Sequence, residues 1–93
     1  MYLLVSRYTA PQERIEELLP AHRAFLEERY AAGDFVLSGR REPWDGGVIV
    51  AASMPRERLD SLLAEDPFAA VVETDVIEFE PLFADARLQF LLT

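Results

Sequence analysis

The order of its secondary-structure segments constrains the fold of this chain more than any other feature. Two segments with helical spacing of apolar residues, 11–32 and 55–65, alternate with short runs of β-branched, aromatic and other apolar residues. These runs predict strands over residues 2–8, 35–40, 47–53 and 74–80. The resulting order β-α-β-β-α-β is typical of the α+β class. It predicts a ferredoxin-like fold, in which two helices cover one face of a four-stranded antiparallel sheet.

Local signals place the ends of the two helices. Thr9 and Gln12 form a capping-box pattern before the first helical segment, and Ser53 is a candidate cap for the second. Pro20 disfavours helical geometry at the residue before it. We therefore expect a short helix over 11–18, a kink or a break, and a main helix over 20–32 that stops at Gly33.

The chain is apolar for its size, since 51% of its 93 residues are hydrophobic. The predicted strands 2–8 and 47–53 carry apolar residues on both faces, although a sheet with one solvated face should alternate apolar with polar. This pattern predicts a homodimer that buries sheet against sheet. We treat 1–93 as one domain, in which the stretch 83–93 is either an extension or an extra strand over 87–92, at a sheet edge or a second interface.

Composition excludes several classes of function. The net charge is −8, and all nine basic residues are scattered arginines, so a nucleic-acid partner is not expected. No apolar run approaches the roughly 18 residues of a membrane span, and no charged leader precedes the first strand, so the expected location is cytoplasmic. Cysteine is absent, which excludes thiol chemistry. We expect no metal and no cofactor, because no phosphate-binding glycine loop occurs and one histidine is too few for a zinc site.

The single histidine, His22, is the main catalytic candidate. It lies within the apolar stripe of the first helical segment, so it faces the sheet rather than bulk water. Asp66 continues the stripe of the second helix, at a position where an apolar residue is expected. Two helices on one sheet face can bring these side chains together, and a carboxylate that binds an imidazole fixes its tautomer and increases its basicity. The alternatives are a histidine bonded within the core and an Asp66 that caps the turn after Pro67.

Weaker candidates lie on the strands. Ser38 and Gly39 fall near the expected pocket, and Arg7 and Tyr8 could bind an anionic or phenolic substrate. Each has a structural alternative; Arg7, for example, could pair with a carboxylate such as Glu78.

Several stretches together resemble the YCII-related (YciI-like) family. The resemblance runs over roughly residues 1–82, and its most specific parts are the helical histidine and the Asp66-Pro67-Phe68 sequence. It implies a dimeric α/β-barrel assembly of ferredoxin-like chains and an active site centred on His22 and Asp66. One relative is similar to a dehydrochlorinase of a chlorinated hydroxyquinol. The other stretches are Ala21–Leu26, Ser38-Gly39, Asp45–Gly47 and Val76–Pro81.

Three functions remain open from the sequence. The first is a small cofactor-free enzyme, lyase-like or hydrolase-like, that uses His22 and Asp66 in acid-base chemistry on a small aromatic or hydroxylated compound. The second is a non-catalytic ligand-binding or dimerisation domain of the same architecture. The third is a dimeric-barrel isomerase or monooxygenase acting on quinone-like substrates.

Overall fold

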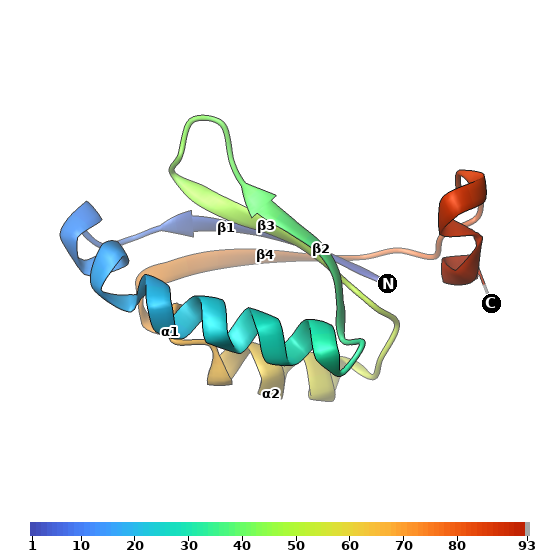
Figure 1. Cartoon of the computed structure of the whole chain (residues 1–93), viewed down its shortest axis with the longest axis horizontal. Helices are drawn as coiled ribbons and strands as arrows, with labels where there is room; N and C mark the ends of the chain where they lie inside the picture. Colours follow the sequence, from blue (N-terminus) through green and yellow to red (C-terminus); the bar gives the residue numbers. More distant parts are fainter. Residues whose placement is uncertain (93) are drawn as a thin grey trace.

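The computed structural model describes residues 1–92 and contains one four-stranded antiparallel sheet. The strands lie in the order β2-β3-β1-β4. Helices α1 (Gln12–Ala31) and α2 (Arg56–Glu65) both cover the same face of this sheet (Figure 1). The ferredoxin-like α+β fold predicted from the order of the segments is therefore confirmed. The strands are β1 (Tyr2–Tyr8), β2 (Phe35–Arg40), β3 (Gly46–Ala51) and β4 (Val72–Glu78).

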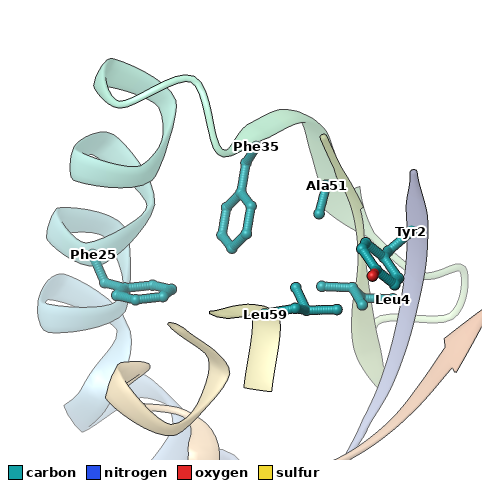
Figure 2. Close-up of a cluster of buried hydrophobic side chains, with 6 residues drawn as sticks. All are labelled: Tyr2, Leu4, Phe25, Phe35, Ala51 and Leu59. Carbon is teal, nitrogen blue, oxygen red and sulfur yellow. The ribbon is translucent and has the colours of Figure 1, made fainter. Parts of the chain in front are cut away.

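The main core fills the space between the helices and one end of the sheet. Figure 2 shows the side chains of Leu4 of β1 and Leu59 of α2 pointing toward each other, and Phe25 of α1 and Phe35 of β2 belong to the same cluster. Leu4 and Leu59 are almost completely buried. Removing these apolar side chains from water is the main force that holds the two helices on the sheet.

Helix α1 runs without a break through Pro20, so the predicted division into two helices is wrong. Pro20 is exposed to solvent. A proline inside a helix frees the carbonyl group four residues earlier, here that of Glu16, and water can reach a carbonyl on an exposed face. The apolar stripe on both sides of Pro20 packs against the protein and outweighs the local penalty.

The expected side-chain caps are also absent. Pro11 occupies the cap position of α1 and Pro55 that of α2, and neither helix start has a side-chain cap hydrogen bond. Ser53 instead accepts a hydrogen bond from the amino terminus at 3.2 Å. Gly33 does end α1, with a φ of 79° that a glycine adopts without strain.

The chain after β4 differs most from expectation. The predicted fifth strand is wrong: residues Ala86–Leu92 form a 3-10 helix, which Figure 1 shows well away from the sheet. Thr93, the last residue of the predicted extension, lies outside the described residues. None of the helices within residues 1–92 is long and apolar enough to cross a membrane.

The face of the sheet away from the helices is apolar at its centre. Leu3 and Val5 alternate with the core residues of β1, and they pair with Val50 and Val48 of β3. Leu37 of β2 is 65% exposed on the same face. The predicted two-sided apolar pattern is therefore present, and one chain leaves this face uncovered.

Candidate active site

His22 and Asp66 form a hydrogen-bonded pair between the two helices. His22 lies on the inward side of α1, and Asp66 is the residue at which α2 ends. The distance from His22 Nδ1 to Asp66 Oδ1 is 2.7 Å, and their side chains are only 14% and 10% exposed. The sequence predicted that these two side chains can meet.

The turn after α2 holds the Asp66 carboxylate in place. Its Oδ1 accepts a second hydrogen bond from the backbone N–H of Phe68 at 2.9 Å, so the capping role expected for Asp66 is also present. The Asp66 carbonyl oxygen accepts the N–H of Ala69 at 2.8 Å. One carboxylate oxygen thus serves both the turn and the histidine.

The imidazole ring is held on its face as well as at its edge. Phe68 stacks on His22 with ring centroids 3.9 Å apart and an angle of 7° between the planes. This stack and the Asp66 bond together fix the position and the plane of the imidazole.

The hydrogen bond determines the tautomer that fits this geometry. An ionised carboxylate only accepts hydrogen bonds, so Nδ1 of His22 must carry the shared proton. In the neutral ring, the lone pair then lies on Nε2. This is the form of histidine that can take a proton from another molecule.

A cavity of about 530 Å³ lies between α1, the turn after α2 and the sheet. This volume is in the range of small-molecule sites. Both members of the pair line it, so an imidazole of defined tautomer borders a space that a ring-sized molecule can enter. The wall also includes Leu19, Arg23, Leu26, Arg40, Trp44, Ile49 and Leu63.

The sheet side of the cavity has hydroxyl groups beside apolar side chains. Ser6 of β1 and Thr74 of β4 share a hydrogen bond of 2.8 Å between their hydroxyls. Both line the cavity at inward positions of their strands. A side chain at Gly46 would collide with the backbone carbonyl of Ser6, so the start of β3 requires glycine. Ser6 and Thr74 were not identified as cavity residues from the sequence. Their polar side chains at core-facing positions of the strands were the signal that could have identified them.

Three of the four weaker candidates line the cavity. They are Tyr8, Ser38 and Gly39. The Ser38 hydroxyl is hydrogen-bonded to that of Tyr30 on α1.

Arg7 lies on the opposite face of the sheet and is absent from the cavity wall. Its guanidinium donates to Asp75 at 3.0 Å and lies 3.7 Å from Glu73, so the carboxylate pairing expected as the structural alternative is present, with these two residues in place of Glu78. The hydrogen bond to Asp75 and the charge of that carboxylate raise the pKa of Arg7 above its ordinary value. Adjacent strand residues point to opposite faces, so Arg7 and Tyr8 cannot share one site.

The part of the chain that the structure describes contains no cluster of three or more histidine or carboxylate side chains suited to a metal ion. The chemistry that its residues can supply at the cavity is proton transfer by His22, with hydroxyl and guanidinium groups to bind a substrate.

A solved structure with the same fold is 5-chloro-2-hydroxyhydroquinone dehydrochlorinase from Burkholderia phenoliruptrix, in complex with 2,5-dihydroxybenzoquinone. The TM-score is 0.68 at 20% sequence identity, over 85% of this chain and 93% of that one, and at this identity the likeness is one of fold. None of the curated proteins matches the sequence. The model of the YCII-related domain matches residues 1–80, so this chain belongs to the YCII-related family.

Proposed function

We propose that the protein is a cofactor-free enzyme in which His22 transfers a proton to or from a small ring compound. The observation that carries this proposal is the 2.7 Å bond between His22 Nδ1 and Asp66 Oδ1 in the wall of a 530 Å³ cavity. His22 is the catalytic residue, and Asp66 is a positioning residue that holds its tautomer. Tyr8 and Ser38 are substrate-binding candidates in the same wall.

The reaction class is elimination or a related proton transfer on a hydroxylated ring. The dehydrochlorinase of the same fold supports this choice, because loss of HCl from a chlorinated hydroxyquinol needs a base and no oxidant. One ring hydroxyl first becomes a carbonyl as its proton moves to the neighbouring carbon that bears chlorine, which gives the keto tautomer. His22 Nε2 then accepts the proton of the hydroxyl para to this carbonyl, and the oxygen's electron pair forms a second carbonyl. The ring double bond shifts toward the chlorine-bearing carbon as chloride leaves with its bonding pair, so the net loss is HCl and the product is a hydroxybenzoquinone.

Replacement of His22 tests the mechanism. We expect His22→Ala to lower turnover of 5-chloro-2-hydroxyhydroquinone about 100- to 10,000-fold, the usual contribution of a general base. The measurements are chloride release and quinone absorbance, with circular dichroism to check the fold. Arg56→Gln is the matched control, because Arg56 lies on the exposed side of α2 and its ion-pair partner within residues 1–92 is Asp60. Turnover by His22→Ala at the wild-type rate would reject the mechanism.

A second experiment separates an enzyme from a ligand-binding domain. Nitrogen-15 shifts of His22 report which ring nitrogen carries the proton. We expect the proton on Nδ1 in the wild type and a mixture of tautomers in Asp66→Asn, whose side chain amide can also donate. If the tautomer does not change, and the protein binds 2,5-dihydroxybenzoquinone but does not turn over 5-chloro-2-hydroxyhydroquinone, the non-catalytic alternative is favoured.

We also propose that two copies pair through the uncovered sheet face. Its centre is apolar over β1 and β3, and Leu37 and Ile77 extend it with 65% and 50% exposure. Apolar patches of this kind mark interfaces, and a two-fold pairing needs only this one patch. The resemblance to YCII-related chains, which implies a dimeric barrel, supports the same arrangement.

Light scattering tests the pairing at micromolar concentration. We expect twice the mass of one chain for the wild type and a single-chain mass for Leu37→Glu. Leu37 is mostly exposed in one chain, so the substitution should leave the monomer folded. Ala24→Glu, on the exposed side of α1, adds the same charge elsewhere and should remain dimeric. A single-chain mass for the wild type would reject the dimer.

A further inference from the structure

The arginines of this chain divide into two groups by their partners. Seven of the nine have a carboxylate oxygen within ion-pair distance. The other two are Arg23 and Arg40, which have no such partner within residues 1–92, and both line the cavity. Among the arginine side chains that the structure describes, those without a carboxylate partner therefore all lie at the cavity.

This distribution is unexpected for so acidic a protein. The chain has 17 acidic residues for nine basic ones, so an arginine finds a carboxylate easily. The two carboxylates of the cavity wall are Glu16 and Asp66, and both have other partners. Asp66 binds His22 and the Phe68 amide, and Glu16 accepts a hydrogen bond from Gln12 at 3.4 Å.

Arg40 is held in place by an aromatic ring. Its guanidinium carbon lies 3.9 Å from the ring centroid of Trp44. A guanidinium that stacks by its face keeps its N–H groups free along its edge, where carboxylate and phenolate oxygens bind. The loop that carries Trp44 is itself tied to the sheet, because the carbonyl of Asp45 accepts the N–H of Tyr8 at 2.8 Å.

We infer that the cavity takes a small organic anion, whose carboxylate or phenolate oxygen binds Arg23 and Arg40 while its reacting group lies at His22. Negative charge at Asp66 disfavours the opposite orientation. The inference rests on the proposed function only in placing the reaction at His22; the charge preference concerns binding alone. It also assigns Arg23, Arg40 and Trp44 a role in substrate selection.

Two ligands of nearly the same shape test the charge preference. At neutral pH 2,5-dihydroxybenzoate is an anion and 2,5-dihydroxybenzamide is neutral. Calorimetry should show that the wild type binds the benzoate at least about tenfold more tightly than the amide, and that added salt weakens only the benzoate. Equal affinities, or no binding of the benzoate at millimolar concentration, would overturn the inference.

Variants then locate the preference. Arg40→Gln and Arg23→Gln should each reduce benzoate affinity several-fold and leave amide affinity unchanged. Arg56→Gln removes the same charge from a paired arginine outside the cavity and should keep the preference. If all three variants behave alike, the preference comes from net charge and the assignment of Arg23 and Arg40 fails.

His22→Ala distinguishes a failure of this inference from a failure of the proposed function. If the wild type prefers the benzoate but turns over no substrate, the anion site is supported and the catalytic proposal is rejected. If the protein turns over neutral ring compounds in a reaction that His22→Ala abolishes, but shows no preference for the benzoate, the catalytic proposal is supported and the anion site is rejected.

Discussion

The two ends of the space between helices and sheet are built from the same elements but are filled differently. At the packed end, which contains Leu4, Phe25 and Leu59, apolar side chains fill the layer. At the open end, which contains Ser6, His22 and Asp66, the same layer holds a cavity. Strand β1 crosses both ends, and its inward residues change from Leu4 to Ser6 at the boundary.

The neighbouring strands change at the same level. On β4, Val76 packs against the core, whereas Thr74 lines the cavity. On β3, Ala51 is fully buried in the core, whereas Gly47 lines the cavity. The larger apolar cluster is therefore at one end, and a smaller buried cluster, formed by Ile15, Phe68 and Val71, lies toward the open end. The open end can hold polar groups and empty space that would be unfavourable in a core.

The largest expected difference between the ends is in apolar packing. Leu59→Ala should lower the free energy of unfolding by about 3 kcal/mol, because it leaves a hole in a filled core. Leu63→Ala, one helical turn later on α2, should lower it by only about 1 kcal/mol, since Leu63 is half-buried and already borders the cavity. Urea denaturation measures both, and equal losses would contradict the division into two ends.

A smaller effect is expected for the turn at the open end. Asp66→Ala removes the acceptor of the Phe68 amide and should lower the free energy of unfolding by about 1–2 kcal/mol. Asp66→Asn keeps an acceptor oxygen, so it should lower the free energy of unfolding by less than half as much as Asp66→Ala. If both variants are as stable as the wild type, Asp66 serves His22 alone and not the turn.

The smallest effect is expected for the hydroxyl pair in the cavity wall. Ser6→Ala and Thr74→Val together remove both partners of one hydrogen bond, so the free energy of unfolding should change by less than about 0.5 kcal/mol. Each single variant leaves a hydroxyl without its partner and should be less stable than the double variant. A double-mutant cycle measures this coupling, and strict additivity would show that the two hydroxyls do not depend on each other.

The order of elements was predictable from the sequence, because hydrophobic spacing reports directly on which residues face a core. Features that depend on a balance between local preferences and tertiary packing were not predictable in this way. Pro20 carries a local penalty, but the stripe it interrupts is long enough to pack as one helix. Residues 86–92 are mostly apolar, but without a sheet edge beside them they form a 3-10 helix instead of a strand.

The centre of the candidate site was predictable for the same reason. His22 and Asp66 occupy apolar positions of two helices that must share a sheet face, so their meeting follows from periodicity. The rest of the cavity wall depends on strand register, which short apolar runs do not specify. Register places Tyr8 at the cavity, and the alternation of side chains along β1 then places Arg7 on the other face.

The shared oxygen of Asp66 has a consequence for the dynamics of the site. Because Oδ1 accepts both the Phe68 amide and His22, we expect opening of the turn and release of the imidazole to be coupled. The amide proton of Phe68 should therefore exchange with solvent at a rate that reports how often the histidine is out of place. A ligand that needs a positioned histidine should slow this exchange without touching the amide itself.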